Sequence, residues 1–284
     1  MDNAVSPMPE APLAMMEVEK TPISTPMHDP PPPEKRYDDE EKTTWECGSW
    51  CEYIFVVVVS SILLLAAIVM TVFWIIFYRQ GYSLEEPIKE FNFHPTLMIT
   101  GFITLTGFSL LLYRICRCCS SLLVNLCHTF FHAASIPCIV LAFLAVFDSK
   151  NATQPPTPHF YSLHSWLGLI CMGLFVFQFI LGFFGFFILL CCENATHKFR
   201  STLVPIHASL GLANFMLAIG AAITGLTEKA LHELGKDTYS GMIEEGIIIN
   251  TIAIILIALG ILVPFAIRRS NSPASFKVYV TETI

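Results

Sequence analysis

Six long apolar segments alternate with short polar ones along the chain, at residues 53–77, 92–113, 121–147, 160–190, 203–226 and 247–267. Each segment is long enough to cross a hydrocarbon core of about 30 Å at a rise of about 1.5 Å per residue. Only helices and closed barrels satisfy their backbone hydrogen bonds in lipid, and runs of this length are helices. The pattern therefore predicts an all-α membrane protein with six transmembrane helices.

Composition agrees with this pattern and divides the chain into three parts. Of the 284 residues, 54% are hydrophobic and only 14% are charged, whereas roughly a quarter of an ordinary soluble domain is charged. Residues 1–52 are acidic and proline-rich, which predicts a disordered tail and no secretory signal. Residues 53–267 are the predicted membrane domain, and 268–284 are a short C-terminal tail. The net charge of -7 comes mainly from tails and loops, so no nucleic-acid partner is expected.

The distribution of lysine and arginine predicts the orientation. Eleven of the sixteen basic residues lie in the tails and loops on the side of the two termini. Because basic residues concentrate on the cytosolic side, both termini are predicted to be cytosolic. The sequon at Asn151 then lies in an outer loop and predicts glycosylation there, whereas the sequon at Asn194 faces the cytosol.

Five cysteines lie beside the membrane on this predicted cytosolic side. S-acylation is expected there, whereas a zinc site would need paired C-x-x-C motifs with matching histidines. The five are Cys116, Cys118, Cys119, Cys191 and Cys192.

Four apolar segments carry a histidine near one end: His94, His128, His164 and His207. An ionisable residue in a bilayer is costly, which indicates a function. His94 and His164 begin spans that run inward, and His128 and His207 begin spans that run outward, so one pair lies near each membrane face. A bis-histidine pair on facing helices is what a b-type haem requires. The pattern predicts two b haems in a helix bundle, the outer one bound by His94 and His164 and the cytosolic one by His128 and His207.

Other interpretations of these histidines stay open. A metal-ion transporter would line one continuous path with its ligands, whereas these histidines cluster at two depths. His132 shares a helix face with His128 and is the second choice of ligand, because it lies four residues deeper than His128 and so mismatches His207. A non-enzymatic membrane scaffold acting through the proline-rich tail is the remaining alternative. Glycines in the spans, Gly182 among them, allow either a flat ring or ordinary helix packing.

Several short motifs, in this order and spacing, resemble the cytochrome b561 family of ascorbate-dependent transmembrane oxidoreductases. The resemblance covers the chain from about Phe91 to Pro264. Its pieces are Phe91-Asn92-Phe93-His94-Pro95 with Met98, Leu111-Leu112-Tyr113-Arg114, His128, Val146-Phe147-Asp148, Tyr161-Ser162-Leu163-His164-Ser165-Trp166, Pro205-Ile206-His207, Gly225-Leu226-Thr227-Glu228-Lys229, and Glu245-Gly246 before Asn250-Thr251.

The resemblance implies that electrons pass from cytosolic ascorbate through two b haems to an acceptor outside the cell or in a lumen. The acceptor would be monodehydroascorbate or a ferric iron chelate, which would make the protein a monodehydroascorbate reductase or ferrireductase. It implies a central four-helix bundle that holds both haems through the same two ligand pairs, and commonly a homodimer in membrane lipid. A secretory vesicle, an endosome or lysosome, and the plasma membrane all suit the predicted orientation.

The chain departs from the family at the cytosolic substrate site. Three residues before the third-span histidine, the family usually has a lysine that helps to hold ascorbate, and this chain has Asn125. Arg114 and Arg200 match basic cytosolic positions of the family, with Lys198 nearby. The resemblance therefore implies an ascorbate site at these four residues.

A second departure lies in the outer loop. After the Val-Phe-acid motif, Lys150 stands where the family has a histidine, although Asn151 remains. His159 lies five residues before His164 and is a candidate to contact an outer substrate instead. Lys150, Asn151 and His159 are thus the candidate residues on the acceptor side.

Overall fold

The structure, a computed structural model, describes residues 36–116, 119–187 and 193–268, with only the backbone described at 36–50, 187 and 193–196. These ranges are helical throughout apart from short connections, and they contain no strand. In chain order the elements are α1 (Arg36–Tyr78), α2 (Pro87–Glu90), α3 (Phe93–Leu97), η1 (Met98–Leu105), α4 (Thr106–Ile115), α5 (Ser121–Ala152), α6 (Leu163–Gly182), η2 (Phe183–Phe187), α7 (Glu193–Ser240) and α8 (Glu244–Arg268).

Six helical segments are long and apolar enough to cross a membrane. They are Cys51–Tyr78, Pro87–Ile115, Ser121–Ala152, Leu163–Phe186, His197–Ser240 and Glu244–Arg268. The predicted all-α membrane fold with six spans is therefore confirmed. The fifth span continues well past residue 226, where the hydrophobic pattern ended it, because charged residues there remain helical. The helical geometry breaks only at Gly235, whose φ is 71°.

The predicted tails fall largely outside the described residues, as do Cys118, Cys191, Cys192 and the side chain of Asn194. The chain divides into two units after Trp45, and all six spans belong to the second. Helix α1 begins at Arg36, inside the segment predicted as a tail. The boundaries of the tails and of the membrane domain therefore stay predictions.

Serine caps fix the starts of the two helices that begin at opposite ends of the bundle. Ser120 precedes α5, and its side chain accepts a hydrogen bond from the backbone N–H of Leu123 at 3.3 Å. Ser162 precedes α6 and forms a reciprocal capping box with Ser165. Such caps satisfy backbone donors that a helix start leaves unpaired. The capping box places His164 in the first turn of α6.

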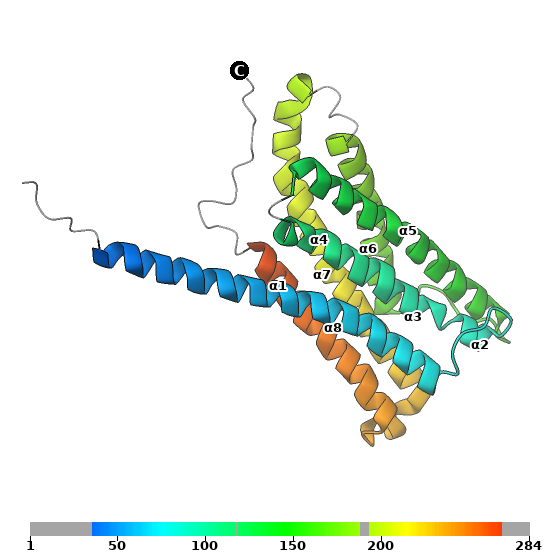
Figure 1. Cartoon of the computed structure of the whole chain (residues 1–284). Coiled ribbons are helices and arrows are strands. Elements are labelled where there is room, and N and C mark those ends of the chain that lie inside the picture. The colour runs from blue at the N-terminus through cyan, green and yellow to red at the C-terminus, as the bar shows by residue number, and fades with distance from the viewer. Residues whose placement is uncertain (1–35, 117–118, 188–192, 269–284) are drawn as a thin grey trace, which may run out of the picture. The chain divides into compact units, whose positions relative to one another are not determined.

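The helices pack in sequence-adjacent pairs (Figure 1): α5 lies along α3, η1 and α4, and α6 lies along α7. Helix α8 packs against α7 and α4. The fully buried side chains Leu64, Leu111, Phe215 and Leu256 place the apolar core where the first, second, fifth and sixth spans meet. Apolar side chains such as Phe130 are exposed on the outward faces, as lipid contact requires.

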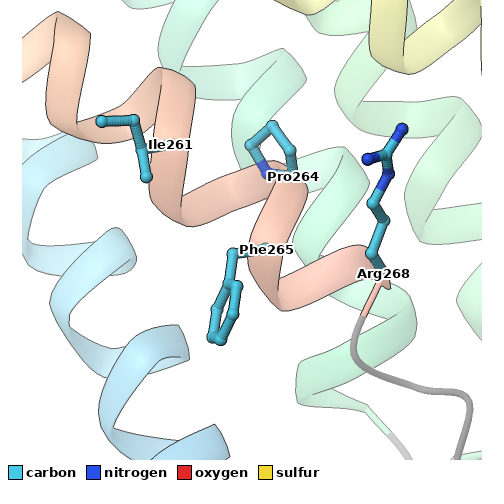
Figure 2. Close-up of a pocket in the computed structure, with 4 residues that line it drawn as sticks. All are labelled: Ile261, Pro264, Phe265 and Arg268. Carbon is cyan, nitrogen blue, oxygen red and sulfur yellow. The ribbon is translucent and has the colours of Figure 1, made fainter.

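An open pocket lies on α8 (Figure 2). It is lined by Ile261, Pro264, Phe265 and Arg268. This lining contains none of the four span histidines, so the candidate site lies elsewhere in the bundle.

Candidate functional site

His94 and His164 face each other across two helices. His94 lies in α3 and His164 in α6, with ring centroids 5.9 Å apart and ring planes at 86°. The Nδ1 atom of His94 is 3.1 Å from the carbonyl oxygen of Ala142, and Nδ1 of His164 is 2.7 Å from that of Ala221. Because a carbonyl only accepts hydrogen bonds, each Nδ1 carries the proton and each Nε2 keeps its lone pair.

His128 and His207 form the second facing pair. His128 lies in α5 and His207 in α7, with ring centroids 6.3 Å apart and planes at 71°. Nδ1 of His128 is 2.8 Å from the hydroxyl oxygen of Ser109, which itself donates to the carbonyl oxygen of His128 at 3.1 Å. Nδ1 of His207 is buried and has no hydrogen-bond partner among the described residues.

Both pairs fit a metal placed between their rings. An imidazole nitrogen lies about 2 Å from a bound first-row metal, so two rings that bind from opposite sides have centroids roughly 6 Å apart. The described residues contain no cluster of three or more His, Cys, Asp or Glu side chains that would hold a bare ion. Two facing imidazoles suit a metal that brings its own equatorial ligands, as iron in a porphyrin does.

Glycines back one ring of each pair. A Cβ atom at Gly225 would lie 2.7 Å from ring atoms of His164, and one at Gly182 would lie 3.1 Å from Cε1 of His207. The backbones of α7 and α6 therefore approach these rings more closely than a side chain would allow.

His132, the second choice of ligand, lies beside the second pair. Its ring is 4.5 Å from that of His128 and 5.8 Å from that of Phe175. Phe175 in turn contacts Phe102 at 5.4 Å. Since His132 contacts His128 on the same helix, it does not face it across the bundle as His207 does.

The four candidate ascorbate residues lie at the helix ends on the side of the second pair. Arg114 lies in the last turn of α4 and donates to the carbonyl oxygen of Ile267. Asn125 is exposed, and its Oδ1 accepts a hydrogen bond from the hydroxyl of Tyr113 at 2.9 Å. The ring of Tyr113 lies 5.3 Å from that of His128, so this contact links Asn125 to the histidine pair.

Lys198 and Arg200 stand near the start of α7. Lys198 is exposed, whereas Arg200 is half-buried with a buried Nε that has no hydrogen-bond partner among the described residues. Both precede His207 by about two turns, so they lie at the same end of the bundle as Arg114 and Asn125.

The three candidate residues on the acceptor side gather around the end of α5. The Nε2 atom of His159 is 2.9 Å from Oδ1 of Asn151, and its ring stacks on Phe147 with centroids 4.5 Å apart. Lys150 Nζ donates to the carbonyl oxygen of Pro158 at 3.3 Å and lies 5.3 Å from the ring centroid of Tyr161. Burial, with a smaller contribution from Glu228, raises the pKa of Tyr161, so its hydroxyl stays neutral beside this lysine.

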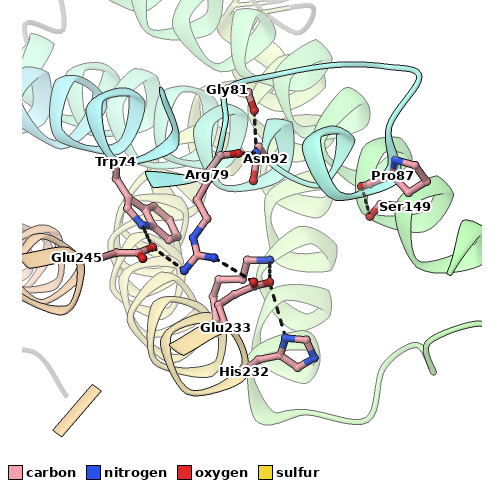
Figure 3. Close-up of polar contacts among 10 residues, drawn as sticks. Trp74, Arg79, Gly81, Pro87, Asn92, Ser149, His232, Glu233 and Glu245 are labelled. Atoms are coloured by element: carbon pink, nitrogen blue, oxygen red, sulfur yellow. Dashed lines mark hydrogen bonds and ion pairs between the residues drawn. The ribbon is translucent and has the colours of Figure 1, made fainter. Parts of the chain in front are cut away.

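A charged cluster lies on the side of the first pair (Figure 3); we call Arg79, Lys229, Glu233 and Glu245 the Arg79 cluster. Arg79 bridges Glu233 at 2.9 Å and Glu245 at 2.5 Å, and Lys229 lies 2.5 Å from Glu233. Trp74 donates its indole N–H to Glu245 at 2.8 Å. Arg79 directly follows α1, so the cluster links the end of α1 to α7 and α8.

Comparisons with known proteins match the same part of the chain. The family model for eukaryotic cytochrome b561 matches residues 93–233, a range that contains all four histidines. The plasma membrane ascorbate-dependent reductase CYBRD1 of Xenopus tropicalis is 35% identical over 211 residues, which cover 73% of this chain and 72% of the relative. This chain belongs to the cytochrome b561 family.

Two further relatives carry different names within the family. The transmembrane ascorbate-dependent reductase CYB561 of Sus scrofa is 33% identical and covers 75% of this chain and 81% of its own. The lysosomal membrane ascorbate-dependent ferrireductase CYB561A3 of Mus musculus is 32% identical, over 72% of this chain and 84% of its own. As a cytochrome b561, the chain is an integral membrane oxidoreductase, and its family implies b-type haem.

Several residues of this cytochrome b561 site carried no signal in the sequence. Ala142 and Ala221 act through their backbone carbonyls, which every residue possesses. Ser109 belongs to no recognisable motif, and Tyr113 stands in a family motif that does not reveal its contacts. Gly225 also stands in a family motif, and its contact with His164 appears only when α6 and α7 are packed together.

Proposed function

We propose that this protein carries electrons across a membrane, from ascorbate on the cytosolic side through two b haems to an acceptor on the other side. The observation that supports it most is the presence of two facing histidine pairs, each of a spacing that fits an iron ion. Ascorbate is the proposed electron donor because relatives of this chain are named ascorbate-dependent reductases. A homodimer in membrane lipid, with both termini cytosolic, is part of this proposal.

The two pairs stand far apart along the bundle. On α7, Ala221, which contacts His164, follows His207 by fourteen residues, a rise of roughly 21 Å. An electron that passes from one pair to the other thus crosses most of the hydrocarbon core. The rings of His132, Phe175 and Phe102 contact one another in the space between.

In this proposal His128 and His207 would hold the haem on the ascorbate side, and His94 and His164 would hold the haem on the acceptor side. A haem bound at each pair would supply one-electron exchange. The hydrogen bonds to Ala142, Ala221 and Ser109 orient the rings and keep the proton on Nδ1.

The ascorbate anion would be bound at the end of the bundle where Arg114, Lys198 and Arg200 supply positive charge. Arg200 offers a buried guanidinium nitrogen that no described residue accepts from. Asn125 replaces the lysine of the family with a neutral group, which weakens the attraction for an anion. The hydrogen bond from Tyr113, whose ring lies 5.3 Å from that of His128, connects this side chain to the histidine pair.

On the acceptor side, His159 supplies the imidazole that Lys150 does not. Its stacking on Phe147 and its hydrogen bond to Asn151 fix the ring at the outer end of α5. A ferric chelate or monodehydroascorbate is the proposed acceptor; the name of the lysosomal relative includes ferrireductase. A glycan on Asn151 would crowd His159, so glycosylation and a substrate role at this residue compete.

Absorbance spectroscopy of the purified protein tests the proposal. We expect two b haems per chain, both reduced by ascorbate, and electron transfer in proteoliposomes to an external ferric chelate or monodehydroascorbate. A protein that binds no reducible haem, or that moves metal ions without reducing them, would overturn it in favour of the transporter. Fractionation of cells would separate an endomembrane from a plasma-membrane location.

A further inference from the structure

The motif that ends in Glu228-Lys229 and the acidic Glu245 belong to the family resemblance, yet the electron path described above gives them no role. The structure brings Lys229 and Glu245 together in the Arg79 cluster, with three of its four charged groups linked through Arg79 (Figure 3). Charged groups at a membrane boundary are costly to desolvate. Such a cost indicates a function for the cluster, and its position relative to the His94–His164 pair suggests which one.

Lys229 is the cluster member that reaches toward the first histidine pair. Ala221, Gly225 and Lys229 follow one another at intervals of four residues, so they share one face of α7. Ala221 accepts the hydrogen bond of His164, and Gly225 packs against the ring of His164. Lys229 comes next on this face, one helical turn beyond the ring.

The ring of Phe91 connects Lys229 to His94. The ammonium of Lys229 lies 4.0 Å from the ring centroid of Phe91, and Phe91 lies 5.9 Å from the ring of His94. The lysine side chain is only 17% exposed. Its charge is thus poorly screened by water.

Glu233, the ion-pair partner of Lys229, lies on the side of the lysine that faces away from the histidines. Glu233 follows Lys229 by one further turn of α7, away from His164, and its carboxylate is also held by Arg79. The ion pair is therefore a dipole with its positive end toward the histidines. A positive charge near iron stabilises the reduced form, because reduction lowers the charge on the metal.

We propose that Lys229 raises the reduction potential of the haem held by His94 and His164, and so favours electron passage toward that side. Lys229 acts as a positioning charge and touches no substrate. This inference rests on the proposed function, because it requires haem at the first pair.

Spectroelectrochemical titration of the full-length protein tests this, with the first pair's transition identified as the one lost in His164→Ala. In Lys229→Met we expect this haem's reduction equilibrium constant to fall about tenfold, which is about 59 mV for one electron. Lys229→Arg should keep the original value. Glu233→Gln, which removes the negative end and retains the lysine, should shift the same transition upward by a smaller amount.

The design separates an electrostatic role from a structural one. In Lys229→Met, Arg79 still pairs with Glu233, so no carboxylate is left alone. Lys236→Met removes an exposed lysine from the same helix and should shift neither haem. Shifts of one sign in both Lys229→Met and Glu233→Gln, or no shift in either, would overturn the inference. Absence of two transitions in the unmodified protein would instead overturn the proposed function.

Discussion

The two histidine pairs have nearly the same spacing but are held in different ways. In the His94–His164 pair both rings donate to backbone carbonyls, at Ala142 and Ala221. In the His128–His207 pair, His128 depends on Ser109, and Nδ1 of His207 has no hydrogen-bond partner among the described residues. A carbonyl partner survives any side-chain substitution, whereas a hydroxyl partner does not. The first pair is thus fixed by the fold itself, and the second is open to adjustment by side chains.

Removing a ring is the strongest test of whether the pairs are independent. We expect His164→Ala to lose the haem of the first pair and keep the other, and His207→Ala to do the reverse, because each variant removes one of the two imidazoles that would hold that haem. Haem per chain, measured by pyridine haemochrome absorbance, should fall to about half in either variant. Loss of both haems in a variant that still folds would contradict two separate sites.

Adding one methyl group behind a histidine ring should reduce haem content at both pairs, but by different amounts. Gly225→Ala would put a Cβ 2.7 Å from His164, and Gly182→Ala would put one 3.1 Å from His207. Overpacking of this kind costs about 1–3 kcal/mol. We expect Gly225→Ala to lower the first pair's haem content markedly and Gly182→Ala to lower the second pair's content less.

The control for these variants is Gly173→Ala, at an exposed glycine of α6 with nothing within 4 Å of its added Cβ. Its haem content should match that of the unmodified protein. Haem spectra and thermal unfolding would be measured on all three variants. An equal loss in all three would mean that the methyl groups disturb the helices and not the rings.

The sequence was sufficient to predict the six spans, because long apolar runs have few alternatives in lipid. It was also sufficient to single out the four histidines, since an ionisable residue stands out in an apolar run. The structure adds the partners of their rings, which depend on helix register: the carbonyl of Ala142 lies beside His94 only once α3 and α5 are packed. The helix of the fifth span extends beyond the predicted apolar segment, because Lys229 and Glu233 resemble a loop in sequence but pair with each other along the helix.

Removing the hydroxyl of Ser109 should weaken the second pair alone. Ser109→Ala leaves His128 Nδ1 only a longer contact, 3.2 Å from the carbonyl oxygen of residue 109. Loss of such an outer partner typically weakens metal binding by about 10- to 100-fold, and we expect the lower end of that range here. The retention of each of the two haems would be measured during a detergent titration.

Ser60→Ala is the matched control, because Ser60 is buried in α1 and its hydroxyl donates within its own helix, to the carbonyl oxygen of Val56. Both haems should be retained in it. Weaker haem retention at the first pair in Ser109→Ala would contradict the separate anchoring of the two histidine pairs.

The smallest effect is expected at the ascorbate side of the second pair, where Asn125 stands in place of the lysine usual in the family. Asn125→Lys adds a positive charge at an exposed position whose neighbour Tyr113 contacts His128. An exposed charge contributes about 0.2–1 kcal/mol, so the KM for ascorbate should fall by a factor of about 1.4 to 5. Raising the salt concentration should reduce this gain, because exposed charges are screened. Asn125→Gln adds length without charge and should leave the KM unchanged; an equal fall in both variants would mean that side-chain reach, and not charge, limits ascorbate binding here.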